Sequence, residues 1–300
     1  MRRGSLPTAL LLLGVRAMDY KFENINVSMS KEEWMRDLGV RDVFSGDTKH
    51  YRIAWIGDST TRNTIHFLCD ILGGTNATHP HSPDCLSPDG RVEIIGKSFG
   101  GPADPWDMRT AGALLDALTN RSLAGREGAP FDAVYFGTTL LHAMQLLPLL
   151  EFRGRKDFNL SGDVAAAVKQ MRARGACPVL HTVNWICDRR FFGEKGAIAQ
   201  GVRASARAAH NHFGPLCEAR NRSRSDTRMC TALSFTARGS EYAAQLERAA
   251  VKALANPIDI VDAHAITREQ CWAAKDGRHY TPLLPMKIAL LVEALRSCLG

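Results

Sequence analysis

The chain has 300 residues, of which 45% are hydrophobic and 23% are charged, and its formal net charge is +7. This length and hydrophobic content suit one large domain with a sizeable core and argue against a disordered chain. The basic residues are spread along the sequence, and no nucleic-acid-binding motif of the usual kinds is present, so we expect no nucleic-acid partner.

The N-terminus has the layout of a signal peptide or signal anchor. Two arginines precede a short apolar stretch from Ala9 to Val15, which is too short for a comfortable membrane span. We therefore expect residues 1–17 to direct the chain into the secretory pathway, with membrane contact only through this segment. Residues 18–49 would form an N-terminal extension, and residues 50–300 the main domain. The alternative is a buried N-terminal helix.

Apolar strand-like runs alternate with amphipathic stretches along the rest of the chain. In chain order the patterns predict helix 30–38, strand 51–56, helix 60–72, loop 75–90, strand 91–95, loop 96–105, helix 108–118, strand 131–136, helix 164–174, strand 178–185, helix 197–219, helix 241–255, strand 257–261 and helix 286–295. This alternation predicts the α/β class, with a mostly parallel sheet covered by helices on both faces. In such sheets the active site lies beyond the carboxyl ends of the strands.

Cysteines and glycosylation motifs also favour the secretory route, toward the Golgi lumen or secretion. The eight cysteines suit disulfides in an oxidising compartment, although the sequence does not reveal which of the 105 pairings is formed. No CxxC pair is present, so a structural zinc site is not expected. Five Asn-x-Ser/Thr triplets could accept glycans. They begin at Asn26, Asn76, Asn120, Asn159 and Asn221.

The first predicted strand ends in Gly57-Asp58-Ser59, where a helix begins at once. A serine at such a turn projects its hydroxyl at the sheet rim, and its backbone N–H lies at a helix N-terminus that favours negative charge. Both features suit a nucleophile whose attack creates an oxyanion. The alternative is that Ser59 or Thr60 only caps the helix.

A base for this serine is available after the last predicted strand, where Asp276 precedes His279 by three residues. Both side chains can point toward the sheet rim from one turn. The carboxylate would fix the imidazole tautomer, and the other ring nitrogen would face Ser59. His142, His181 and His264 also end or follow strands, but only His279 has such an orienting partner.

The motif from Gly57 to Asn63 and the motif from Asp276 to Tyr280 together resemble those of the SGNH/GDSL-like acyl-esterases. The resemblance is to the PC-esterase branch, which includes the trichome-birefringence-like polysaccharide O-acetyltransferases and the Golgi sialic-acid O-acetyltransferase. It extends in element order over roughly residues 50–297, with sharp motif agreement only at the two ends. It implies a three-layer α/β/α sandwich with an SGNH hydrolase-like catalytic domain at residues 50–300.

The resemblance also implies an oxyanion hole. The family places a glycine after its second strand, which corresponds here to Gly100 or Gly101, with Gly100 preferred beside the backbone N–H of Ser59. Its third donor is an asparagine after the next strand, and residues 136–142 contain none. Thr138, or a backbone N–H of its loop, is expected to substitute. One missing donor costs a factor of about a hundred or more in rate.

Two further residues are candidates for substrate binding, Arg62 one turn past Ser59 and Asn184 at the end of a predicted strand. We expect neither a cofactor nor a metal. The predicted function is a serine-dependent acyl esterase or O-acyl(acetyl)transferase acting on carbohydrate or lipid hydroxyl esters. One alternative is a catalytically impaired glycan-binding protein that keeps the fold, because the oxyanion loop is altered. Another is a cytosolic α/β protein in which the motifs arose by chance.

Overall fold

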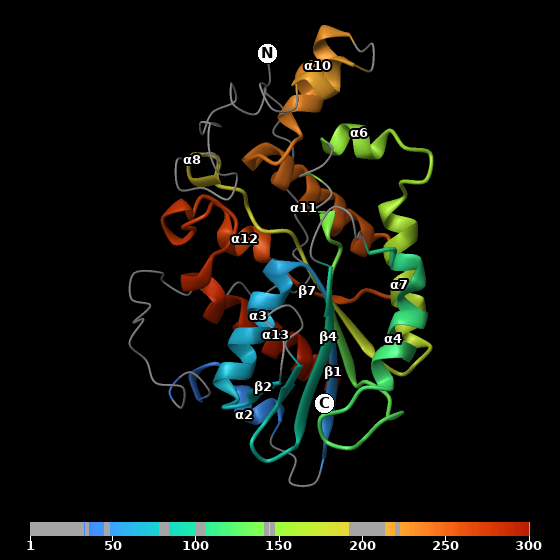
Figure 1. Cartoon of the computed structure of the whole chain (residues 1–300), viewed down its shortest axis with the longest axis vertical. Helices are drawn as coiled ribbons and strands as arrows, with labels where there is room; N and C mark the ends of the chain where they lie inside the picture. The colour runs from blue at the N-terminus through green and yellow to red at the C-terminus, as the bar shows by residue number, and fades with distance from the viewer. Residues whose placement is uncertain are drawn as a thin grey trace, which may run out of the picture.

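A seven-stranded sheet forms the centre of the structure (Figure 1). The structure is a computed structural model that describes residues 33, 36–44, 49–77, 84–99, 106–140, 144, 148–191, 214–219 and 223–299. The strands are β1 (Tyr51–Gly57), β2 (Thr75–Ala77), β3 (Asp84–Leu86), β4 (Val92–Ser98), β5 (Ala133–Gly137), β6 (Cys177–His181) and β7 (Asp259–Val261). They lie in the order β2-β3-β4-β1-β5-β6-β7. The strands from β4 to β7 pair in parallel, and β2 and β3 add an antiparallel edge.

Helices cover both faces of the sheet (Figure 1). One face carries α2 (Val40–Val43), α3 (Ser59–Ile71) and α13 (Leu284–Leu299). The other face carries η2 (Met108–Thr110), α4 (Ala111–Thr119), α7 (Leu160–Arg172) and α11 (Ala237–Lys252). The shorter helices are α6 (Leu149–Arg153), α8 (Asp188–Phe191), α10 (Arg224–Ala232), α12 (Ala263–Thr267), η3 (Cys271–Ala273) and η4 (Thr281–Leu283). The predicted α/β class and three-layer α/β/α sandwich are confirmed.

The apolar run of β1 packs against both helical layers. Ile53 and Trp55 lie in the core under α3 and α13, whereas Ala54 and Ile56 lie in the core under α4, α7 and α11. Successive side chains of a strand point to opposite faces, so a strand covered on both sides is nearly continuous in apolar residues, with the buried Arg52 paired to Glu93 as the exception in β1. This requirement explains why the sequence pattern located the central strands well.

Two predicted segments differ from the structure. The loop predicted at 75–90 contains β2 and β3, and the disulfide between Cys69 and Cys85 ties β3 to α3. The strand predicted at 178–185 ends at His181 as β6, because the backbone N–H groups that follow bond to side chains of α11 and α12. The signal segment 1–17 and most of the extension 18–49 and of helix 197–219 lie outside the described residues.

All eight cysteines form disulfides, so no thiol is free. The pairs are Cys69–Cys85, Cys177–Cys298, Cys187–Cys271 and Cys217–Cys230. Within the described part of the chain, no helix is both long enough and apolar enough to cross a bilayer.

Strand β1 lies where the connections leave the sheet in opposite directions. Helix α3, which follows β1, covers one face, and α7, which follows the neighbouring strand β5, covers the other. In open α/β sheets, ligands bind beyond the carboxyl ends of the strands at such a switch point. Ser59 begins α3, two positions after the end of β1, so this turn lies where the fold predicts a ligand site.

Candidate active site

The turn between β1 and α3 is built around Asp58. Its extended backbone caps the helix, and its carboxylate accepts hydrogen bonds from the backbone N–H groups of Thr60 at 2.8 Å and Thr61 at 3.5 Å. A larger residue in place of the preceding Gly57 would clash with α3, because its Cβ atom would lie 2.5 Å from the Thr61 hydroxyl oxygen. Ser59 is thereby the first residue of α3 and presents its hydroxyl at the sheet rim. Its N–H belongs to the first helical turn, which favours negative charge.

A tight turn near the C-terminus, just before η4, carries Asp276 and His279. One carboxylate oxygen of Asp276 accepts hydrogen bonds from the backbone N–H groups of Arg278 at 3.2 Å and His279 at 2.9 Å. Gly277 has a φ of 84°, a left-handed conformation that glycine adopts without steric cost. The aspartate therefore both shapes the turn and faces the histidine ring.

The three side chains meet in a continuous chain of contacts. The Nδ1 atom of His279 lies 2.5 Å from the Oδ2 atom of Asp276, and its Nε2 atom lies 2.8 Å from the Oγ atom of Ser59. The side chains of His279 and Asp276 are 22% and 29% exposed, so solvent reaches them. With the Nδ1 proton donated to Asp276, Nε2 is an acceptor for the serine proton.

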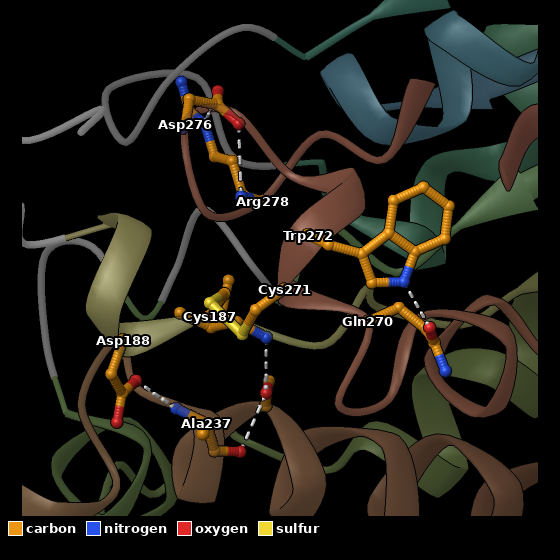
Figure 2. The surroundings of a disulfide bond; sticks show 10 residues. Cys187, Asp188, Ala237, Gln270, Cys271, Trp272, Asp276 and Arg278 are labelled. Atoms are coloured by element: carbon orange, nitrogen blue, oxygen red, sulfur yellow. Dashed lines mark hydrogen bonds and ion pairs between the residues drawn. A yellow bond between two sulfur atoms is a disulfide. The ribbon is translucent and has the colours of Figure 1, made fainter. Parts of the chain in front are cut away.

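The electrostatics keep Asp276 ionised. Burial alone would raise its pKa, but hydrogen bonding and charge attraction with His279, together with the two backbone N–H groups, outweigh burial and hold that pKa well below its usual range. The Arg278 guanidinium adds an ion pair, with Nε 3.6 Å from the carboxylate (Figure 2). An ionised carboxylate at this place stabilises the imidazolium that forms when His279 takes a proton.

A disulfide anchors this turn to the segment that follows β6. Cys187 bonds to Cys271 on η3, and the backbone N–H of Cys187 donates to the carbonyl of Gly277 at 2.8 Å. Figure 2 shows the disulfide with Asp276 and Arg278 on one side and Asp188 and Ala237 on the other. The Asp188 carboxylate accepts the Ala237 N–H at 2.6 Å, which ties the same segment to the start of α11.

Of the two further residues predicted to line the oxyanion hole, the structure describes Thr138 but not Gly100. Thr138 is buried, and its hydroxyl donates to the Glu247 carboxylate, so its side chain is not directed at an oxyanion. The next residue, Thr139, has a φ of 60°, which is strained for a β-branched side chain. Any oxyanion donor that Thr138 supplies must therefore be its backbone N–H.

The two predicted substrate-binding residues, Arg62 and Asn184, differ in burial and in their contacts. Arg62 is half-buried on the first turns of α3, and burial lowers its pKa while the Asp58 carboxylate opposes that shift. Asn184 is only 1% exposed. Its amide nitrogen donates to the Arg278 carbonyl at 2.8 Å, and its oxygen accepts from Lys287 at 2.6 Å. The assignment of Asn184 to substrate contact is thus replaced by a buried structural link.

Two of the remaining candidate histidines, His181 and His264, lie in the core away from Ser59. His181 and His264 are buried, and burial is the main cause that lowers their pKa values to about 3 and about 4. His142 lies outside the described residues. Among the residues that the structure describes, no group of three or more His, Cys, Asp or Glu side chains could hold a metal ion.

Sequence reasoning missed two buried charged residues next to the site, Glu247 and Lys287. Burial raises the pKa of Glu247 to about 8 and lowers that of Lys287 to about 7. A signal was present in both cases. Glu247 falls on the buried stripe of α11, and Lys287 falls on the buried stripe of α13. A charge at a core position of an amphipathic helix indicates a specific partner.

Comparisons with known proteins give only distant structural likenesses. No protein-family model matches the chain, and no curated protein matches its sequence. An acetyl-xylooligosaccharide esterase from Geobacillus is 12% identical, with 84% of this chain and 95% of that chain covered and a TM-score of 0.43. A GDSL-like lipase from Bacteroides thetaiotaomicron is 10% identical, with coverages of 89% and 99% and a TM-score of 0.41.

Proposed function

We propose that the protein is a serine-dependent acyl esterase or O-acyl(acetyl)transferase, with Ser59 as nucleophile, His279 as general base and acid, and Asp276 as the group that orients His279. The observation that carries the proposal is the 2.8 Å contact between His279 Nε2 and Ser59 Oγ, extended by the 2.5 Å contact to Asp276. A nucleophile, its base and an orienting carboxylate in hydrogen-bond reach are the signature of this chemistry.

The reaction proceeds in two steps. His279 takes the Ser59 proton as Oγ attacks the ester carbonyl, and the resulting oxyanion lies at the N-terminus of α3, beside the backbone N–H of Ser59. When the carbon–oxygen bond of the ester breaks, His279 returns the proton to the departing alcohol and the acyl group stays on Ser59. A water molecule or a sugar hydroxyl then attacks the acyl-enzyme and gives its proton to His279, and His279 returns this proton to Ser59 Oγ as the bond between Ser59 and the acyl group breaks. Water makes the protein an esterase, and a sugar acceptor makes it a transferase.

A carbohydrate ester is favoured over a lipid ester by the surface beside the site. Trp272 on η3 is 62% exposed, and its ring nitrogen donates to Gln270 at 2.7 Å (Figure 2). Glu269, Gln270 and Lys275, two to three positions away in the chain, are polar, and the other exposed large apolar side chains of the described residues, Leu216 and Met229, lie on different segments. A single flat ring in polar surroundings suits a sugar face rather than an acyl chain.

Labelling with a fluorophosphonate probe tests the proposal directly. The wild-type protein is expected to be labelled and to hydrolyse p-nitrophenyl acetate, whereas Ser59→Ala and His279→Ala lose both activities. Ser225→Ala, an exposed serine on α10, is the matched control and keeps both. Unchanged hydrolysis by Ser59→Ala would overturn the proposal. Adding a sugar acceptor and measuring acylated sugar against free acid separates transferase from esterase.

A second function, a glycan-binding protein without turnover, is favoured by one observation. The Thr138 hydroxyl is held by Glu247, and no asparagine follows β5, so the oxyanion hole lacks the side-chain donor expected there. Absence of probe labelling together with retained binding to an acetylated glycan would support this function.

A further inference from the structure

Two buried side chains connect helix α13 to the turn that carries His279. Lys287, on the first turns of α13, is 1% exposed, and its ammonium group donates to the Oδ1 atom of Asn184 at 2.6 Å. Asn184 is equally buried, and its Nδ2 atom donates to the backbone carbonyl of Arg278 at 2.8 Å. The link ends one residue before His279, the base of the proposed reaction.

The lysine determines which way the asparagine amide points. An ammonium group has donors and no acceptor, whereas an amide has one of each. If the Asn184 amide were reversed, its NH₂ group would face the Lys287 ammonium and its oxygen would face the Arg278 carbonyl. Both contacts would then be repulsive, so Lys287 holds Asn184 in the one orientation that donates to the His279 turn.

Lys287 is costly to bury. Burial lowers its pKa to about 7, and the Asp58 carboxylate opposes this shift. The charged and titratable groups that act on this region from the other elements are Asp58 at the start of α3 and His181 at the end of β6. An apolar residue of similar size would pack here without desolvating a charge. A buried lysine at this place therefore points to a role other than stability.

We propose that Lys287 and Asn184 are positioning residues that hold the Arg278–His279 backbone so that the His279 ring meets Ser59. The inference rests on the proposed function, since it assigns these residues to the same reaction. Neither residue touches substrate. The N-terminal side of the turn is held separately, through the bond from the Cys187 N–H to the Gly277 carbonyl, so the turn remains folded when the Lys287 link is cut.

Three variants test the link. Lys287→Met is expected to lower kcat for p-nitrophenyl acetate about 10- to 100-fold, the cost of a small misplacement of a reacting group, with KM unchanged and thermal stability equal or higher. Asn184→Asp keeps an acceptor for Lys287 but replaces the donor facing the Arg278 carbonyl, and it is expected to show the same loss. The double variant should lose no more than the worse single variant, because both act through one link. Lys252→Met, at an exposed lysine of α11, is the control.

The outcomes separate this inference from the proposed function. Full kcat in Lys287→Met and Asn184→Asp, with an active wild type, overturns the inference alone, and so do losses that add in the double variant. Amide hydrogen exchange at 278–280 provides a readout that does not need activity. Faster exchange in both variants than in Lys252→Met supports the link, whereas equal rates overturn it even if the wild type has no esterase activity.

Discussion

The Nε2 atom of His279 lies 2.8 Å from the Oγ atom of Ser59, although 220 positions separate the two residues along the chain. Ser59 is placed by the Asp58 cap at the start of α3, and His279 by the Asp276 turn before η4. Each position is defined by local hydrogen bonds, and the parallel sheet brings the two turns to one edge. The site is therefore assembled from two short motifs, and the His279 turn is also held from outside by the Cys187 N–H and the Asn184 amide.

Replacement of Asp276 by asparagine should remove most of the activity while preserving the fold. The amide oxygen can still accept the backbone N–H groups of Arg278 and His279, so the turn persists. Its NH₂ group, however, would favour the tautomer that places a proton on Nε2, facing Ser59. We expect kcat to fall about 10³- to 10⁴-fold, as in other Ser-His-Asp triads, with little change in the thermal midpoint. A loss smaller than tenfold would mean that Asp276 does not orient His279.

Both turns of the candidate site could be located from the sequence because their signals are local, and the catalytic roles of their residues stay predictions. Gly57 is required by its contact with Thr61, and Asp58 caps the next turn. The supporting residues are different. Glu247 bonds to Val183, 64 positions away, and Lys287 bonds to Asn184, 103 positions away. Such pairs follow from the packing of helices on the sheet, and no spacing rule along the chain encodes them. The cysteine pairing was undetermined for the same reason.

Two disulfides of comparable loop length should have different effects on catalysis. Cys187–Cys271 closes a separation of 84 residues beside the His279 turn, and Cys177–Cys298 closes 121 residues between the start of β6 and the end of α13. Replacing either pair by serines should cost about 5 kcal/mol of stability by the chain-entropy argument. Only the replacement of Cys187 and Cys271 should also lower kcat. Equal kcat values in the two double-serine variants, measured well below their unfolding temperatures, would contradict this.

Glu247 should make stability depend on pH in a direction opposite to that of most carboxylates. Burial raises its pKa to about 8, against about 4.3 in an unfolded chain. Its contribution is therefore fully present below pH 4.3 and is lost as the pH rises through about 8. Glu247→Gln keeps an acceptor for the Val183 N–H and presents its NH₂ group to the Thr138 hydroxyl, which can turn to accept it, but the glutamine cannot ionise. Its free energy of unfolding should match that of the wild type near pH 4 and exceed it at pH 8. The difference in free energy of unfolding should grow by at most about 1.4 kcal/mol per pH unit.

Urea unfolding at several pH values measures this difference. Glu127→Gln, in an exposed loop, is the control and should follow the wild type throughout. A gap for Glu247→Gln that does not change between pH 4 and pH 8 would show that the carboxyl does not titrate in this range.

The compartment can be tested through the glycosylation motifs. Of the five, Asn120 and Asn159 are exposed on the described surface, so both can accept a glycan if the chain enters the secretory pathway. Glycosidase treatment of protein made in a secretory host should increase its gel mobility, and replacing both asparagines by glutamine should reduce the shift. No shift, together with eight alkylatable thiols in the unreduced protein, would instead indicate a cytosolic chain.

Trp272 should matter for a sugar substrate and not for a small ester. It lies four positions before Asp276, so their Cα atoms lie within about 14 Å, a span that an oligosaccharide of a few units can cover. The hydrogen bond to Gln270 and the disulfide at Cys271 hold the indole in place, which reduces the entropy lost when a ligand stacks on it.

Trp272→Ala is therefore expected to lower kcat/KM for an O-acetylated cello-oligosaccharide about three- to tenfold, because loss of aromatic stacking costs about 1 kcal/mol. The kcat/KM for p-nitrophenyl acetate should stay at the wild-type value. Met229→Ala, which removes an exposed apolar side chain on α10, should change neither. If Trp272→Ala lowered both values equally, the indole would support the turn rather than the substrate. If instead it weakened turnover of a long-chain acyl ester selectively, a lipid would be the better substrate, because the flat ring would then be serving an acyl chain.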